Sequence, residues 1–533
     1  MSERADLAEP RPDDFEDIAA GQVESRHDED DRLKGEFVDA VLDAVEADDR
    51  ERARELVSPL HPADIADLLE LTPSERRGEV AAALGDLVGA EVLSELNDYV
   101  RDDLLDALLP EQVAEFAAEL DTDDAVAIIE DMEEADQQAV LDALDPEDRA
   151  AIESALSYPE ESAGRLMQRD LVAVPEHMTV GQVIDYLRDN RDLTTDFWEI
   201  FVVDEAHRPI GTCQLSWVLT CPRSVAMADL MKREQTLIPV DMDQEEVALR
   251  FQKYALISAA VVDHNERLVG MITVDDIVHI IQEEAGEDVL LLSGAGDGDI
   301  NEPIVSTIKT RMWWLFINLW TAILAAAVVA VFQDTIARLV TLAVLMGIVN
   351  GMGGNAATQT MAVTVRTRVV WLILNLGATI CSASVVGLFQ GEIRKYALLA
   401  ALMPMVSALG GNAGTQTLAV VVRALATNQL TSSNTAWMLF REFRIAIANG
   451  IALGIVGGLG TYVALRDPML SVVFAVALVI NSLVAGLVGV LVPLTLDKAR
   501  IDPAVSSAVF VTTMTDVMGF FSFLGLAAIF LTR

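Results

Sequence analysis

Asp516 is the residue whose type and setting point most directly to chemistry. It is the one acidic residue in the apolar stretch AVFVTTMTDVMGFFSFLGLAAIF, and it follows Thr512, Thr513 and Thr515. A carboxylate inside such a segment is costly and is usually retained as an ion site or proton relay, although an Asp that hydrogen-bonds a neighbouring helix is an alternative. One carboxylate beside several hydroxyl groups suits a cation that keeps its water, as Mg2+ usually does because it dehydrates reluctantly.

A second polar feature, the run GGNAxTQT, occurs twice inside apolar segments. Residues 311–366 and 368–423 align without a gap at an offset of 57, so that Asn355 corresponds to Asn412, and about half of the aligned positions are identical. Each copy has the pattern of two helices, so the second copy keeps the orientation of the first. The Asn, Thr and Gln side chains must hydrogen-bond a neighbouring helix or line an aqueous path, and both interpretations fit the sequence.

A third feature is a predicted helix rich in carboxylates. Its acidic residues are Asp275, Asp276, Glu283, Glu284, Glu287 and Asp288. Like charges on one short helix repel each other unless a cation compensates them. The segment is therefore either a solvated acidic face or a site for a divalent cation bound by carboxylate oxygens.

The distribution of charge divides the chain into a strongly acidic region and a nearly uncharged one. Residues 301–533 hold 8 acidic and 14 basic residues. Residues 1–300 hold 75 acidic and 23 basic residues, and the formal net charge of the whole chain is −46. A single soluble globule and a nucleic-acid-binding protein are both excluded by this pattern, because phosphate contacts need a basic surface. The three cysteines give no disulfide framework. Only 6 of the 37 basic residues are Lys, so part of the acidity could instead be an adaptation to high salt.

The acidic part divides into segments of different pattern. Residues 1–34 have little to bury and are expected to form a disordered acidic tail without a signal peptide. Residues 35–156 have the pattern of short amphipathic helices, which predicts an all-α superhelical domain. Residues 157–274 contain a strand–turn–strand unit twice, with Val202-Val203-Asp204 recurring as Val261-Val262-Asp263. This α+β unit resembles a tandem pair of cystathionine-β-synthase-type (CBS) modules, and residues 275–310 form the acidic connection to the apolar part.

Residues 311–533 are predicted to form an all-α transmembrane bundle. Seven stretches are long and apolar enough to span a bilayer: Trp313–Phe332, Ile336–Val365, Val369–Phe389, Tyr396–Val422, Ile445–Leu465, Met469–Leu496 and Ala504–Leu531. With the N-terminus in the cytoplasm, nine flanking Lys and Arg residues lie inside and five outside, in agreement with the positive-inside rule. We therefore expect a multi-pass protein of the cytoplasmic membrane with an external C-terminus.

This order of parts, with GGNAGTQ in one span and TTMTDVMGFF in the last, resembles the MgtE family of magnesium channels over residues 35–533. The resemblance implies a homodimer that carries Mg2+, in which cytosolic Mg2+ bound around the connecting "plug" helix closes the pore. It implies that Asp516, Asn412, Thr415 and Thr512 line the pore. It also implies a set of regulatory Mg2+ ligands: Asp243, Glu245, Asp276, Glu284, Glu287 and Asp288, with Glu91 and Asp123 as partners in the N-terminal domain. ATP or another adenine nucleotide is a candidate ligand of the CBS pair.

The chain departs from the family pattern in two ways. His279, Ala255 and Ala127 stand where some members have Asp, which affects the number of regulatory ions. Seven spans replace the family's five, and we expect that residues 368–423 line the pore while the first copy is peripheral. A proton-coupled divalent metal transporter and a non-conducting Mg2+ sensor are the alternative functions, whereas no nucleophile–base pair or phosphate loop suggests an enzyme.

Overall fold

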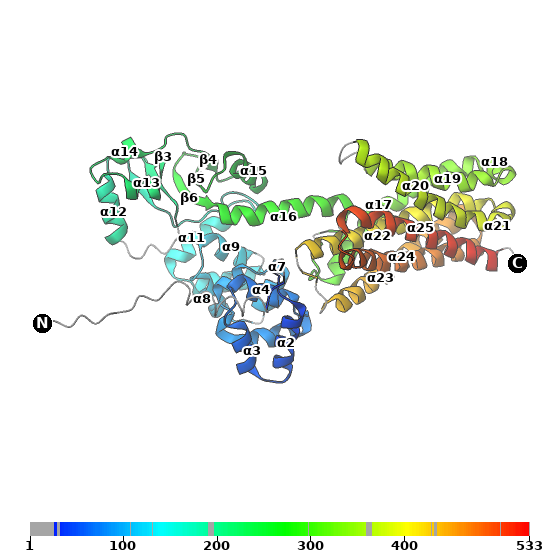
Figure 1. Cartoon of the computed structure of the whole chain (residues 1–533), viewed down its shortest axis with the longest axis horizontal. Coiled ribbons are helices and arrows are strands. Elements are labelled where there is room, and N and C mark those ends of the chain that lie inside the picture. The colour runs from blue at the N-terminus through cyan, green and yellow to red at the C-terminus, as the bar shows by residue number, and fades with distance from the viewer. Residues whose placement is uncertain are drawn as a thin grey trace. The chain divides into compact units, whose positions relative to one another are not determined.

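The computed structural model describes residues 26–28, 32–106, 108–130, 132–189, 197–296, 298–358, 365–427, 429–430, 434–501 and 503–531. Within these ranges, the side chains of residues 288, 355–358, 365–371 and 505–506 are not described. The predicted acidic tail lies almost wholly outside these residues. The chain divides into two compact units, residues 1–286 and 287–533, and each is considered by itself (Figure 1).

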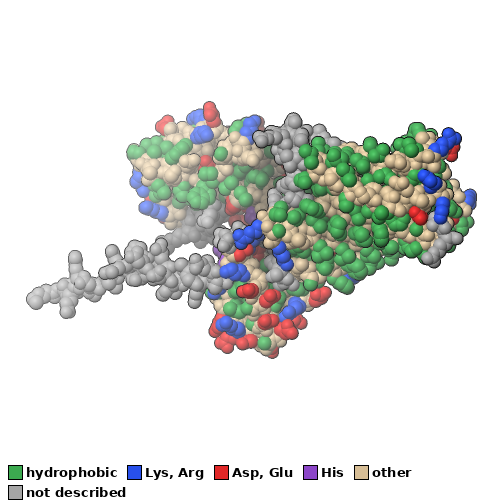
Figure 2. Space-filling view, turned by 45° about the vertical axis from the view of Figure 1, so that its right-hand side comes forward, with side chains coloured by type: hydrophobic (Ala, Val, Ile, Leu, Met, Phe, Trp, Pro, Cys, Tyr) green, Lys and Arg blue, Asp and Glu red, His purple; other side chains and the backbone are tan. Residues whose placement is uncertain are grey.

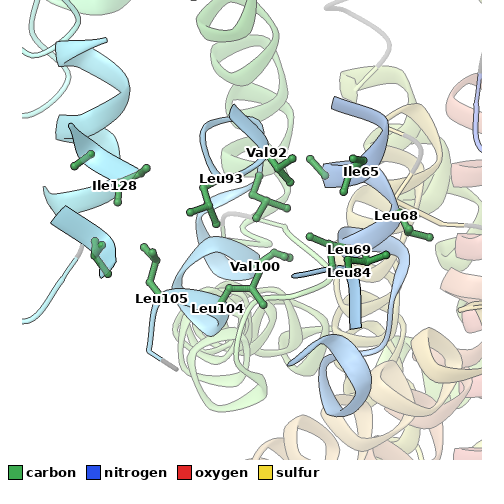
Figure 3. Close-up of a cluster of buried hydrophobic side chains, with 14 of the residues drawn as sticks. Ile65, Leu68, Leu69, Leu84, Val92, Leu93, Val100, Leu104, Leu105 and Ile128 are labelled. Atoms are coloured by element: carbon green, nitrogen blue, oxygen red, sulfur yellow. The ribbon is translucent and has the colours of Figure 1, made fainter. Parts of the chain in front are cut away.

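The first unit opens with the predicted domain of short helices. Prolines at the first helical position and side-chain caps set many of the helix starts: Pro62 follows the cap His61, and Asn97 accepts a hydrogen bond from the Val100 amide. Leu68, Leu93 and Ile128 lie in one buried apolar cluster (Figure 3). The helices are α2 (Gly35–Glu46), α3 (Arg50–Val57), α4 (Pro62–Leu71), α5 (Ser74–Leu84), α6 (Ala90–Ser94), α7 (Asp98–Leu105), α8 (Pro110–Ala117), α9 (Thr122–Glu130), α10 (Glu134–Ala143) and α11 (Pro146–Leu156), with the 3-10 turn η1 (Gly85–Leu87).

The strand–turn–strand repeat forms two three-stranded sheets with the same topology. In both, the first strand is parallel to the second and the second is antiparallel to the third, and the register shifts after Val202 in one sheet and after Val261 in the other. The prediction of a tandem CBS-type α+β pair is confirmed. Its elements are β1 (Ala173–Pro175), α12 (Val180–Asp189), β2 (Glu199–Val203), β3 (Pro209–Gln214), α13 (Leu215–Thr220), α14 (Met227–Leu230), β4 (Leu237–Pro239), α15 (Gln244–Tyr254), β5 (Ser258–Val262) and β6 (Leu268–Thr273).

The second unit is helical and apolar on its surface (Figure 2). Trp320 is 73% exposed and Val331 79%, and such large exposed apolar side chains are expected where a protein faces lipid. The carboxylate-rich segment forms α16 (Val274–Ser293), which begins in the first unit. The remaining helices are α17 (Ile304–Val331), α18 (Gln333–Arg338), α19 (Thr341–Thr358), α20 (Val365–Leu388), α21 (Gln390–Lys395), α22 (Leu398–Ala426), α23 (Thr435–Leu465), α24 (Pro468–Lys498) and α25 (Pro503–Phe530).

The structure reproduces the internal duplication in its helix boundaries. The helix ends Val331 and Leu388 differ by the repeat offset, and so do the starts of α18 and α21 and of α19 and α22. The two copies nevertheless exchange partners. The first helix of copy one, α17, packs against α22 of copy two and against α23, while α19 packs against α20. The buried residues of α17, among them Arg311, Leu315 and Leu319, recur every three or four positions and form the stripe that makes this contact.

This exchange corrects the expectation that the whole first copy is peripheral. One helix of each copy, α17 and α22, belongs to the tightly packed bundle with α23–α25, and one of each, α19 and α20, forms the added pair. Among the described residues, five helices are long and apolar enough to cross a membrane: α17, α22, α23, α24 and the part of α25 from Ser507. The described apolar parts of α19 and α20, Thr341–Gly354 and Leu372–Leu388, are shorter, and they adjoin residues 355–371, whose side chains are not described. The count of seven spans therefore stays a prediction.

Candidate functional site

Asp516 faces a small cavity between helices of the second unit. Its carboxylate accepts a hydrogen bond from the hydroxyl of Ser407 on α22. Four helices contribute to the cavity wall, whose residues are Met346, Gly347, Asn350, Gly351, Thr379, Ser382, Met403, Pro404, Ser407, Asp516 and Phe520. About 30 Å³ is open to the centres of water molecules, and roughly 10–15 Å³ is enough for one water. The site can therefore hold a carboxylate together with a few waters.

The other predicted pore residues, Asn412, Thr415 and Thr512, do not line this cavity. Asn412 lies five residues after Ser407 on α22, which is about 7.5 Å along a helix, and Thr512 lies one turn before Asp516 on α25. These two helices approach closely near Gly414, where an added Cβ would lie 2.7 Å from Val511 Cγ1. The hydroxyls of Thr415 and Thr512 donate to their own helices, to Asn412 O at 2.9 Å and Ala508 O at 2.8 Å.

An ionic cluster that the sequence analysis did not identify joins three helices of the bundle. Arg311 of α17 donates to both carboxylate oxygens of Glu442 on α23, at 2.7 and 3.1 Å, and Thr417 of α22 donates to the same carboxylate at 2.8 Å. Arg441 contacts Glu442 at 3.3 Å and donates to Glu302 O at 2.8 Å. All of these side chains are buried, so the charges hold the first bundle helix in a defined position.

The GGNAGTQT run of α22 is tied to the end of the carboxylate-rich helix. Gln416 Nε2 donates to the carbonyl oxygen of Gly294, one residue after α16, at 2.9 Å. Both residues belong to the second unit. Since Thr417 holds Glu442, two successive residues of the run connect α22 to α16 on one side and to α23 on the other. In the first copy, the side chains of the corresponding run are not described from Asn355 onward.

In the first unit, two of the predicted regulatory carboxylates lie close together. Burial, and then the Asp276 carboxylate, raise the pKa of Asp123 well above its usual range, and Asp123 Oδ1 is buried without a hydrogen-bond partner among the described residues. Burial also raises the pKa of Asp276 to about 6 against the hydrogen bond from Thr273. The pKa of Asp124 is raised to about 6 by burial and by Asp121 and Glu95. A cation between these groups would offset both the burial and the repulsion.

The remaining predicted ligands do not form a ready coordination shell. Asp243 caps α15 by accepting from the Glu245 amide at 3.0 Å, and Glu284 accepts from Gln244 Nε2 at 2.8 Å. Glu91 and Glu287 are exposed, and the side chain of Asp288 lies outside the described residues. Within the described part of the chain, no group of three His, Cys, Asp or Glu side chains is placed to hold a metal ion.

The fold and these sites define a multi-pass membrane protein that carries a CBS pair and an acidic helical domain. Residues 403–526 match the family MgtE, described as a divalent cation transporter; residues 60–161 match the MgtE intracellular N domain; residues 163–213 and 227–283 match the CBS domain. The chain belongs to the MgtE family.

Two curated relatives are similar to the chain over most of its length. The chain is 26% identical over 478 residues to the magnesium transporter MgtE of Bacillus subtilis, covering 90% of this chain and 94% of the relative. It is 28% identical over 507 residues to the magnesium transporter MgtE of Thermus thermophilus, covering 92% and 98%. Among solved structures, the cytosolic domain of the Mg2+ channel MgtE in complex with ATP is 32% identical, with a TM-score of 0.42, covering 46% of this chain and 99% of that one.

Proposed function

We propose that the protein conducts Mg2+ across the cytoplasmic membrane through a channel that contains Asp516, and that cytosolic Mg2+ closes this channel. The observation that carries the proposal is the Asp516 carboxylate, paired with Ser407 and facing a water-sized cavity inside an apolar helix bundle. A carboxylate with neutral oxygen neighbours can attract a divalent cation through its water shell. The relatives' name, magnesium transporter, supports Mg2+ as the ion carried.

The same proposal assigns gating to the acidic first unit. When cytosolic Mg2+ is scarce, Asp123 and Asp276 repel each other at short range, and when it is abundant, the bound cation holds α9 and α16 together. Mg2+ then favours one of two conformations by binding it more tightly. The contact from Gln416 to Gly294 supports a route from α16 to the pore helix α22. A homodimer and an adenine nucleotide at the CBS pair belong to this proposal.

Uptake of Mg2+ into proteoliposomes containing the full chain tests the proposal. Asp516→Asn keeps the size of the side chain and removes its charge, so we expect Mg2+ flux to fall at least tenfold. Asp497→Asn is the matched control, because Asp497 is exposed at the end of α24. Wild-type flux in Asp516→Asn would contradict the assignment. Flux that follows an imposed pH gradient, and not the membrane potential or the Mg2+ gradient, would instead identify a proton-coupled transporter.

A further inference from the structure

We infer that the added helix pair α19–α20 forms a second polar wall of the cation path, in which Asn350, Thr379 and Ser382 hold the water around the ion opposite Asp516. The inference rests on the proposed function, because it treats the Asp516 cavity as part of that path. Family membership does not supply these residues, since the matched family region begins at residue 403. They lie wholly within the added pair.

Two walls of the cavity are formed by equivalent residues of the two repeat copies. Met346, Gly347 and Asn350 of α19 and Met403, Pro404 and Ser407 of α22 all line it. These two sets correspond position by position at the repeat offset of 57. Asn350 is therefore the repeat equivalent of Ser407, the residue that hydrogen-bonds Asp516. The duplication has placed the same face of two equivalent helices on one cavity.

Helix α20 forms another wall of the cavity. It carries hydroxyl groups at two positions where α17, its equivalent in the first copy, carries alanine. Thr379 and Ser382 correspond to Ala322 and Ala325 of α17. Ala322 is buried in the bundle contact, whereas Thr379 and Ser382 line the cavity. The packing partners therefore match the chemistry of the two helices. Helix α17, with alanine at these positions, packs against α22, and α20, with hydroxyl groups, faces the cavity beside Asp516.

The hydroxyl groups are oriented to accept and not to donate. Thr379 Oγ1 donates to Asn375 O and Leu376 O, both at 3.0 Å, and Ser382 Oγ donates to Ala378 O at 3.4 Å. Each hydroxyl has one proton, so its lone pairs remain for water or a cation. Thr379 and Ser382 are 6% and 4% exposed. Gly351 allows α19 to approach, since an added Cβ would lie 2.7 Å from Thr379 Cγ2.

This donor set suits a divalent cation that retains water. One carboxylate, the amide of Asn350 and three hydroxyls, including that of Ser407, supply oxygen atoms, with only Asp516 carrying a formal charge. Such a site contacts the ion mainly through bound water, which is the usual way in which Mg2+ is held. We therefore expect the added pair to affect both the rate of Mg2+ transport and its discrimination from Co2+ and Ni2+.

Fluxes of Mg2+, Co2+ and Ni2+ in proteoliposomes of the full chain test this role. The variants are Asn350→Leu and the double variant Thr379→Val/Ser382→Ala, which remove polar atoms with little change in volume. Ser384→Ala is the matched control, because Ser384 lies on the same helix and is exposed outside the cavity. We expect at least a tenfold loss of Mg2+ flux or a threefold change in the Mg2+/Co2+ ratio for the cavity variants, and wild-type values for Ser384→Ala.

A conservative variant separates this role from misfolding. Thr379→Ser keeps the hydroxyl and should retain Mg2+ flux and ion preference. Wild-type flux and selectivity in both cavity variants, together with loss of flux in Asp516→Asn, would overturn the role of the added pair and leave the proposed function intact. Equal loss in Thr379→Ser and Ser384→Ala would also overturn it, because the effect would not depend on the cavity hydroxyls. Wild-type flux in Asp516→Asn would overturn the proposed function itself.

Discussion

The first two glycines of the GGNAGTQT run, Gly410 and Gly411, have different surroundings. At Gly410 an added Cβ would lie 2.0 Å from Asn481 Nδ2, whereas at Gly411 nothing lies within 4 Å. Asn481 is buried and donates a hydrogen bond to Val406 O at 2.8 Å, and this bond would break if the side chain moved away from an added Cβ. The first glycine is therefore required by packing between α22 and α24, and the second has an open side.

We predict that Gly410→Ala destabilises the protein by about 1–3 kcal/mol, the usual cost of overpacking a tight contact. Gly411→Ala is the control on the adjacent residue, and we expect it to be neutral or slightly stabilising because alanine is the better helix former. Thermal unfolding of the purified full-length variants in detergent measures both. Equal destabilisation by the two substitutions would contradict the packing argument.

Some residues of the site could be predicted from the sequence and others could not. Asp516 was identifiable because a carboxylate in an apolar segment is rare and costly. The pair Arg311–Glu442 was not, because its members are 131 residues apart and no local pattern connects them. Ser407 is an ordinary helix serine in sequence, and only the packing of α22 on α25 brings it to Asp516. Long-range partners of this kind depend on tertiary packing.

At the level of elements, the contact between α9 and α16 should depend on pH. The pKa of Asp276 in the folded chain is raised to about 6, against about 3.9 for an unfolded Asp. The folded state therefore binds more protons between about pH 4 and pH 6, and stability falls as pH rises through this window. Above about pH 6 the charged Asp276 carboxylate lowers the free energy of unfolding by its full amount, on the order of 2–3 kcal/mol. Mg2+ can offset the penalty at neutral pH, when the carboxylates are charged.

We predict that Mg2+ slows hydrogen exchange in α9 of the full chain at about pH 7.5 but has little effect at about pH 5, where the raised pKa values leave these carboxyls protonated. Comparing samples with and without Mg2+ at each pH removes the intrinsic pH dependence of exchange. Asp276→Asn should reduce the Mg2+ effect severalfold, whereas Asp229→Asn, an exposed carboxylate of the CBS pair, should not. A Mg2+ effect that is equal at the two pH values would show that these carboxylates do not bind the ion.

The elements themselves followed well from sequence patterns, but their pairing did not. Helix starts, the CBS sheets and the repeat boundaries were all marked by caps, alternating apolar residues or direct identity between copies. The exchange of partners was not predictable in this way, because α19 and α22 have nearly the same apolar pattern and either could cover α17. The alanines Ala322 and Ala325, opposite Thr379 and Ser382 in the alignment, are the signal that distinguishes α17 from α20.

For the whole molecule, the exchange of partners predicts which part of the duplication can be removed. Deleting residues 333–389 joins Phe332 to Gln390, which repeats the native junction of Phe389 with Gln390. The resulting chain keeps α17 against α22 and keeps Arg311 with Glu442. Deleting residues 311–367 instead requires α20 to occupy that position, which places the hydroxyl of Thr379 at the buried, apolar position of Ala322.

We predict that the chain lacking 333–389 remains folded and inserts in membranes, with altered ion preference, and that the chain lacking 311–367 is less stable by about 1–3 kcal/mol, the cost of burying one hydroxyl in an apolar contact. Thermal unfolding in detergent, followed by the flux assay for the stable variant, tests this. Lower stability of the first deletion than of the second would show that α17 is not the permanent partner of α22.

The crossed arrangement also sets an order of events during biosynthesis. As the chain leaves the ribosome, α19 and α20 are complete before α22, and the carboxylate that neutralises Arg311 is made 131 residues after it. The locally paired helices can assemble at once, because neighbours in sequence meet with little loss of chain entropy. The α17 helix must instead wait in the membrane until α22 and α23 arrive. Docking of the first apolar helix that was synthesised is therefore delayed until its partners α22 and α23 have been made.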